Sequence, residues 1–186
     1  MTTHCNAHPS TMLNRLIALL LPLCLALAAH AAEVVTPDSI VSFTVPDEFT
    51  TFSSDEIKQK WPTSASPPSF AVGNPKRSTS IAYDLKANPL RAENLDQALK
   101  AFEAVFSRIV PGIVWKRREM VELAGRKWVM MELTSNAIDS DIYNIMLITS
   151  FRGRMLTLNF NSTKRDFEQM EPALRRSVAS LKVNDG

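Results

Sequence analysis

Residues 142–161 read IYNIMLITSFRGRMLTLNFN, and this stretch decides the fold. It holds two apolar runs separated by Arg152-Gly153, a two-residue connection in which glycine allows the positive φ of a tight turn. In the first run both alternating sets of residues are largely apolar, so we expect a strand that is covered on both faces. The stretch therefore predicts an antiparallel sheet with helices on both sides of it.

Further strands are predicted on the N-terminal side of this hairpin. Leu123-Ala124-Gly125 joins two more strand candidates and supplies a glycine for another tight turn. Earlier in the chain, Pro46 ends one short strand, and the turn-rich segment 73–76 separates two others. We expect an α+β domain whose sheet has about six strands, drawn from residues 40–45, 69–72, 79–85, 113–121, 126–134, 142–151 and 154–161.

Two segments carry apolar residues at helical spacing. The first predicts a helix over 95–110, with Asn94 as its N-cap and Pro111-Gly112 as its end. The second, near the C-terminus, contains Pro172, which interrupts a helix interior. There we expect a short helical turn that ends near Met170 and a separate helix that starts with the proline in its first turn. A further short helix is expected at 55–60.

The N-terminus has the three parts of a secretory signal peptide. Arg15 precedes an apolar run from Leu16 to Ala29, and the small-x-small site Ala29-His30-Ala31 follows. The run is shorter than the roughly 20 residues of a membrane span. We expect cleavage after Ala31, with Met12 as the likelier start, so that residues 32–186 form one exported domain, periplasmic or secreted. The alternative is a lipid anchor at Cys24, which Leu23 disfavours because a small residue is wanted there.

Removal of this leader excludes several kinds of chemistry. Both cysteines and all three histidines lie within residues 1–30, so the mature chain has no catalytic or metal-binding Cys or His. The glycines are not spaced for a phosphate loop. We predict no enzyme, no catalytic residue, no cofactor and no metal site. Losing Arg15 lowers the net charge from +2 to +1, so we expect no nucleic-acid partner.

The C-terminal stretch resembles the PsbP-like/DcrB-like family. The shared features are a turn glycine leading into Arg154–Phe160, then Phe167, an interior Pro172 and the terminal Ser180-Leu181. Ser42-Phe-Thr-Val-Pro46 is similar to the first strand of that family. The resemblance implies an α/β/α sandwich and non-enzymatic work by docking onto other proteins. It assigns no functional residue, because the shared motifs concern packing and turns.

A set of aromatic residues flanks the irregular, proline-bearing segment 47–72. Phe49, Phe52 and Trp61 are candidates for contact with a partner, because binding sites are often built on loops and Trp is frequent at hot spots. Packing of the same residues over one sheet face is the simpler interpretation. We expect an exported protein-binding accessory or chaperone-like module whose partner is another envelope or secreted protein. The alternatives are a periplasmic immunity or inhibitor protein and a carrier of a small apolar ligand.

Overall fold

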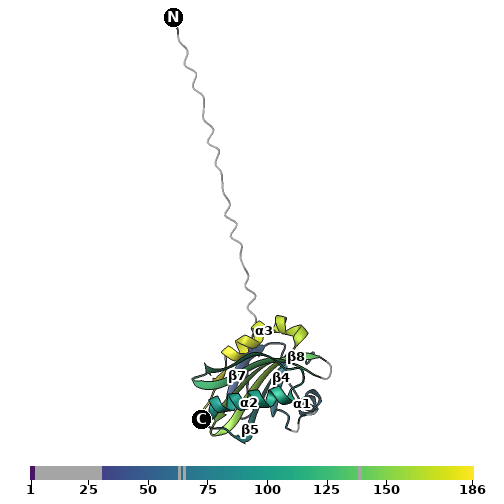
Figure 1. Cartoon of the computed structure of the whole chain (residues 1–186). Coiled ribbons are helices and arrows are strands. Elements are labelled where there is room, and N and C mark those ends of the chain that lie inside the picture. The colour runs from purple at the N-terminus through teal and green to yellow at the C-terminus, as the bar shows by residue number, and fades with distance from the viewer. Residues whose placement is uncertain (3–30, 63, 65, 138–139) are drawn as a thin grey trace.

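The computed structural model describes residues 1–2, 31–62, 64, 66–137 and 140–186. These residues form an α+β fold with three α-helices and two antiparallel sheets (Figure 1). The helices are α1 (Ser54–Lys60), α2 (Leu95–Ile109) and α3 (Lys164–Ala179), and a 3-10 turn, Ala92–Asn94, precedes α2. The strands are β1 (Ala31–Val35), β2 (Val41–Pro46), β3 (Thr50–Thr51), β4 (Phe70–Gly73), β5 (Thr79–Pro89), β6 (Val114–Leu123), β7 (Arg126–Asn136), β8 (Asp141–Phe151), β9 (Arg154–Thr163) and β10 (Lys182–Val183).

The main sheet has seven strands in the order β3-β4-β5-β9-β8-β7-β6. Six of them were expected from the sequence, and the seventh, β3, is only two residues long. The expected strand at 40–45 does not join this sheet. It forms β2 of a separate three-stranded sheet in the order β1-β2-β10, whose two outer strands the sequence analysis missed.

Both expected tight hairpins are present. β6 and β7 are joined by Ala124 and Gly125, with φ of 50° and 71°, and β8 and β9 are joined by Arg152 and Gly153, with φ of 50° and 76°. Positive φ at both loop residues is the geometry of a type I′ turn, which matches the twist of the paired strands.

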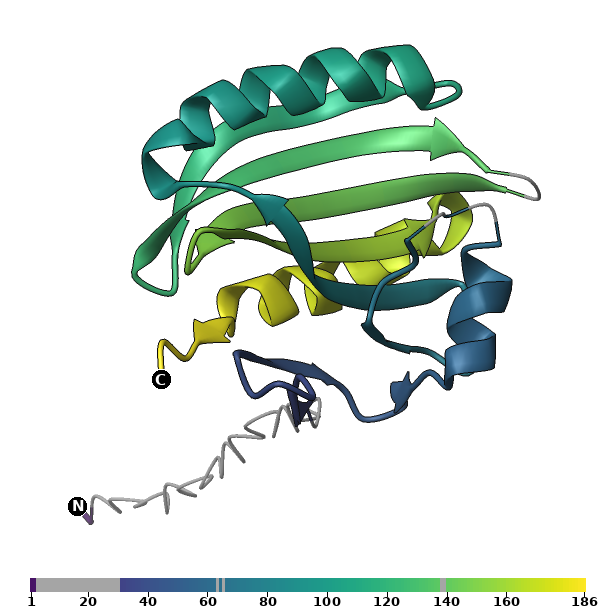
Figure 2. The ribbon, with the colours of Figure 1, turned by 90° about the horizontal axis from the view of Figure 1, so that it is seen from below.

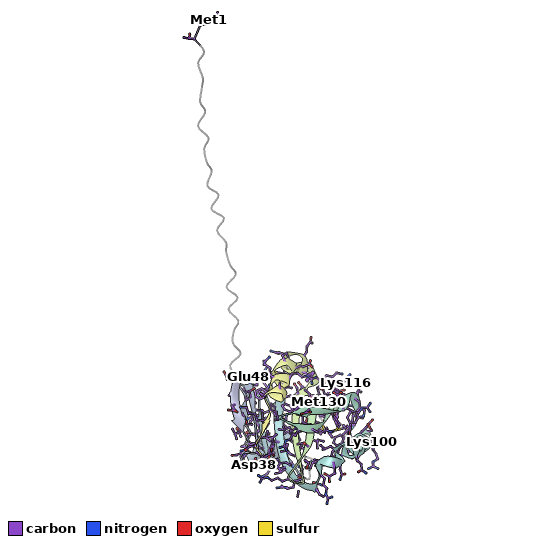
Figure 3. All side chains as sticks on the ribbon, turned by 90° about the vertical axis from the view of Figure 1, so that its left-hand side faces the viewer. Met1, Asp38, Glu48, Lys100, Lys116 and Met130 are labelled. Atoms are coloured by element: carbon purple, nitrogen blue, oxygen red, sulfur yellow. The ribbon has the colours of Figure 1, made fainter. Side chains whose placement is uncertain are left out.

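The two faces of the main sheet belong to different apolar clusters. On β7, Trp128 and Met130 (labelled in Figure 3) pack into the larger cluster with Leu174 and Val178 of α3, whereas Val129 and Met131 pack with the α2 side chains. On β8 the same alternation gives Ile145 to the α3 side and Ile148 to the α2 side. Apolar residues on both faces of these strands, as expected from 142–151, are thus covered by helices on opposite faces of the sheet.

The predicted break at Pro172 is wrong. α3 is one continuous helix, and Pro172 lies inside it with its side chain exposed. The Thr163 hydroxyl caps its N-terminus by accepting from the Asp166 N–H. Leu174 and Val178, beyond the proline, are buried in the same cluster as Phe167 before it. Burial on both sides of Pro172 offsets the single backbone hydrogen bond that proline removes.

The expected helix at 95–110 is present as α2, but two of its details differ. Asn94 makes no side-chain capping bond, because the 3-10 turn Ala92–Asn94 already leads the chain into the helix. Ile109, placed in the apolar stripe by its spacing, is 59% exposed. The apolar stripe packs on the sheet as far as Phe106, whereas Ile109 at the C-terminal end of α2 stays at the surface.

The described fold begins at β1, where Ala31 pairs with Pro46 of β2. The apolar run 16–29, Cys24 and Met12 lie outside the described residues, so the signal peptide and its cleavage site stay predictions. In the part of the chain that the structure describes, no helix is long and apolar enough to cross a membrane.

Candidate functional site

The aromatic residues proposed from the sequence are mostly interior. Phe49 is 8% exposed in the α3-side cluster, and Phe52 is 4% exposed beneath α1. The Arg77 guanidinium lies 4.5 Å from the Phe52 ring centroid. Trp61 is half-buried at the C-terminal end of α1, so of the three candidates it presents the most side chain to a partner.

Two helices share one face of the main sheet but lie near its opposite ends. α1 packs through Ile57 on Ala71 of β4 and Ala82 of β5, whereas α2 lies over β6 and β7. Four strand spacings separate these positions, about 19 Å. Helices in contact lie about 8–10 Å apart, so α1 and α2 do not pack against each other, and neither helix lies over the strands between them. Figure 2 shows α1 and α2 lying apart on this face of the sheet.

The floor of this space, here called the central strip, is polar at its middle. The cross-strand register places Asn144 opposite Asn161 and Met146 opposite Asn159, all on the face that carries α1 and α2. The four polar residues of the strip belong to none of the apolar clusters, whereas its two methionines, Met146 and Met155, pack against the α2-side cluster. The central strip consists of Asn144, Met146, Met155, Thr157, Asn159 and Asn161.

The side-chain amides of the central strip satisfy one another only in part. The Asn144 Oδ1 accepts from the Nδ2 of Asn161 at 2.8 Å and from the Nδ2 of Asn159 at 3.4 Å. The buried Oδ1 of Asn159 has no partner among the described residues, and neither has the Oγ of Ser80, which lies opposite Asn161. Buried polar groups are almost always paired. These two oxygens therefore mark a place where the described residues do not supply every hydrogen-bond partner.

The α2 border of the strip carries small and exposed apolar residues. Glu103 and Ser107 on the opposite side of α2 contact Arg118 and Trp115 of β6. At 3.6 residues per turn, Ala98, Ala101, Val105 and Ile109 therefore line the side that faces away from β6. Val105 is 39% and Ile109 is 59% exposed.

An open pocket of about 440 Å³ lies at the N-terminal half of α2, on the same side as these residues. Its lining comes from the end of β5 and from the helix: Pro89, Leu90, Arg91, Asn94, Gln97, Ala98 and Ala101.

Charge is nearly absent from the central strip. Asp84 and Lys86 of β5 lie opposite Thr157 and Met155 of the strip and pair with each other, and the Lys86 Nζ also donates to the Ser66 carbonyl at 3.1 Å. Among the described residues, no group of three or more His, Cys, Asp or Glu could hold a metal ion. The strip thus offers neutral hydrogen bonds beside an apolar wall, which suits binding.

The two edges of the main sheet differ. β3 at one edge has two residues, whereas β6 at the other runs from Val114 to Leu123. The basic triplet 116–118 lies on β6, where Arg117 pairs with Glu119 and Arg118 pairs with Glu103 of α2. The triplet is therefore largely neutralised and does not form a phosphate-binding patch.

Sequence reasoning missed a buried ionic cluster beneath α3. Glu132 of β7 is 2% exposed and accepts two hydrogen bonds from Arg175 of α3, at 2.6 and 2.7 Å. The Tyr143 hydroxyl donates to the same carboxylate at 2.9 Å, and Arg117 lies 3.6 Å away. Burial opposes ionisation of Glu132, but these hydrogen bonds and charges outweigh it and hold the pKa of Glu132 below its usual value. Because its hydrogen bonds are satisfied, the cluster fixes α3 on the sheet.

A second, partly buried contact joins the two sheets. The Tyr83 hydroxyl of β5 donates to the Oδ2 of Asp38, in the loop between β1 and β2, at 2.5 Å. Burial and then this hydrogen bond raise the pKa of Tyr83. Burial opposes ionisation of Asp38, but the hydrogen bonds from Tyr83 and Thr36 outweigh it, so the pKa of Asp38 is lowered.

Comparison with solved structures defines the class of fold. Cyanobacterial PsbP (CyanoP) from Synechocystis sp. PCC 6803 superposes with a TM-score of 0.57 at 12% identity, over 84% of this chain and 94% of that one. LpqN, described as involved in cell envelope biogenesis of Mycobacterium tuberculosis, has a TM-score of 0.53 at 12% identity, over 83% of this chain and 91% of that one. The fold is therefore PsbP-like, as the resemblance implied.

A protein of Bacteroides thetaiotaomicron gives a TM-score of 0.51 at 13% identity, over 82% of this chain and 48% of that one. No family model and no curated protein matches the sequence. At these identities the likeness concerns the fold, so any function has to be argued from the site.

Proposed function

We propose that this protein is an exported, non-enzymatic binding module of the cell envelope that holds a segment of another protein over the central strip. The observation that carries the proposal is the strip itself, where partly satisfied asparagine amides lie beside exposed Val105 and Ile109. Amides bind neutral polar groups, and exposed apolar side chains rimmed by polar ones are typical of interaction sites.

An extended polypeptide segment fits the spacing of the floor. Asn159 and Asn161 are two residues apart on β9 and point to the same face. Their separation along the strand is about 6.8 Å, which is also the two-residue repeat of an extended peptide. A segment that runs along β9 would present equivalent backbone groups to both amides, with α2 on one side of it and α1 on the other.

The polar floor disfavours the alternative of a carrier for a small apolar ligand. An apolar ligand would cover the half-buried Asn159 and Asn161 without giving their amides a hydrogen-bond partner. Burying unpaired amides costs about 1–3 kcal/mol each on the scale of protein mutations. The expected export and the described role of LpqN in cell envelope biogenesis support the envelope as the compartment.

The test is site-specific photo-cross-linking in the exporting cell. A photoreactive phenylalanine analogue is placed at Val105 or Ile109, which border the strip, and at Val35, which is similarly exposed at 54% but lies on β1. The proposal expects one discrete cross-linked partner at the first two positions and its absence at Val35. Cross-links of equal strength at Val35, or none at either strip position, would overturn it.

A further inference from the structure

We infer that a second copy of this chain pairs antiparallel along the edge strand β6, with Met120 opposite Met120 of the other copy. This inference rests on the sheet edge and is independent of the proposed function. β6 is the outermost strand of the main sheet and pairs only with β7 among the described strands. Its outer side therefore carries backbone N–H and C=O groups available for another strand.

The hairpin decides which backbone groups point outward. In a two-residue hairpin the residues next to the loop exchange backbone hydrogen bonds, and here these are Leu123 and Arg126. Counting back along β6, the alternate residues Arg118, Met120 and Glu122 direct their N–H and C=O groups away from β7. The register shift between Trp115 and Arg117 lies before this segment, so residues 117–123 form a regular strand.

Charge then favours one register over those that are centred on a charged residue, and this register adds two pairs of opposite charge. Opposed residues in an antiparallel pair lie on the same face, and like charges placed opposite each other are destabilising. A two-fold axis at Arg118 sets Arg118 against its own copy, and an axis at Glu119 does the same for that glutamate. An axis at Met120 instead sets Arg118 against Glu122 of the other copy, twice, so that the Arg118 guanidinium, which already pairs with Glu103 of its own chain, gains a second carboxylate. It also uses the whole regular segment 117–123.

The position of α2 is compatible with this pairing. α2 lies over β6 and β7, half a strand spacing inside the edge, so the two copies of α2 would run about 10 Å apart on the same face of the joined sheet. That is a normal distance between packed helices. Both central strips then lie on one face of a continuous sheet.

Charge reversal tests the register. Sedimentation equilibrium of residues 31–186, which contain every described helix and strand, is expected to show a reversible dimer. Arg118→Glu and Glu122→Arg should each weaken the dimer at least about tenfold, or about 1.4 kcal/mol. The double variant R118E/E122R should restore it, because each pair re-forms with its charges exchanged. Lys116→Glu, an equal charge change outside the paired segment, is the control and should dimerise like the wild type.

Disulfide formation by two single-cysteine variants gives a second test of the register. Residues 31–186 contain no cysteine, so Met120→Cys introduces a single thiol directly opposite its copy. Opposed Cα atoms of a hydrogen-bonded pair are about 5.5 Å apart, which suits a disulfide. The inference expects rapid oxidation of Met120→Cys to a covalent dimer and slow oxidation of Val114→Cys. A wild type that is monomeric at every concentration, or a dimer unaffected by both single charge reversals, would overturn the inference.

Discussion

Arg175 of α3 donates two parallel hydrogen bonds to the Glu132 carboxylate of β7, at 2.6 and 2.7 Å, between α3 and the main sheet. The Glu132 side chain is 3% exposed, whereas the Arg175 side chain is 36% exposed. Glu171, one turn earlier on α3, accepts from the same guanidinium at 3.0 Å. The pair thus joins α3 to β7, the strand next to the edge of the main sheet, and Arg117 of the edge strand β6 lies 3.6 Å from the same carboxylate.

Removing the cation should destabilise the fold more than removing the pair. Arg175→Met leaves Glu132 buried without its main partner, and the expected loss is about 3 kcal/mol in the free energy of unfolding. The double variant R175M/E132Q should lose less, because no uncompensated charge remains. Urea denaturation measures both, with Arg176→Met, an exposed neighbour, as the control. Equal losses in the single and double variants would contradict this account.

Acid should weaken the fold through the same carboxylate. The pKa of Glu132 is lowered from its ordinary value of 4.5. The stabilisation is therefore complete above about pH 4.5, where the unfolded carboxyl is ionised, and is lost as pH falls through the lower folded pKa. Urea midpoints measured from pH 7 down to pH 3 should fall less steeply for Glu132→Gln than for the wild type. Parallel curves would show that Glu132 does not carry this part of the acid sensitivity.

The bond between Tyr83 and Asp38 should anchor the small sheet to the main one. Tyr83→Phe removes the donor to a charged acceptor and is expected to cost about 1.5–3 kcal/mol of stability. A double-mutant cycle with Asp38→Asn separates this coupling from the effect of each single change. If the cycle gives no coupling, the 2.5 Å contact contributes nothing to stability.

Replacing Pro172 should stabilise the protein. Its ring removes one hydrogen bond from the interior of α3, and its side chain is exposed, so nothing in the core depends on it. Pro172→Ala is expected to raise stability by about 1–3 kcal/mol, at roughly 2–4 °C in Tm per kcal/mol. Calorimetry checks the shift, with Ala173→Ser as a neighbouring control. A lower Tm for Pro172→Ala would mean that the proline fixes a bend that the packing needs.

The sequence predicted most of the main sheet because its signals are local. Two glycine-bearing loops and the doubly apolar run 142–151 define four neighbouring strands without any knowledge of distant contacts. The break at Pro172 failed because the burial of Leu174 and Val178, a tertiary effect, outweighs one lost hydrogen bond. Short strands such as β3 and β10 have too few residues for any period to be seen.

The candidate site was harder to predict than the fold. Phe49 and Phe52 are aromatic residues in an irregular segment, but they are covered by α3 and α1, which no local pattern reveals. The pattern that could have indicated the site is the pair Asn159 and Asn161, which alternate with the buried Leu158 and Phe160. Neutral amides in a sheet that is expected to carry helices on both sides indicate a place that those helices do not cover.

The most direct test of the central claim is the affinity of the cross-linked partner for the strip variants, measured by calorimetry. The double variant N159A/N161A removes two floor amides, whereas Asn88→Ala removes an exposed amide at the end of β5. The account predicts at least about tenfold weaker binding, or about 1.4 kcal/mol, for the double variant, and an unchanged affinity for Asn88→Ala. Equal affinities for the wild type and N159A/N161A, with both proteins folded, would contradict it.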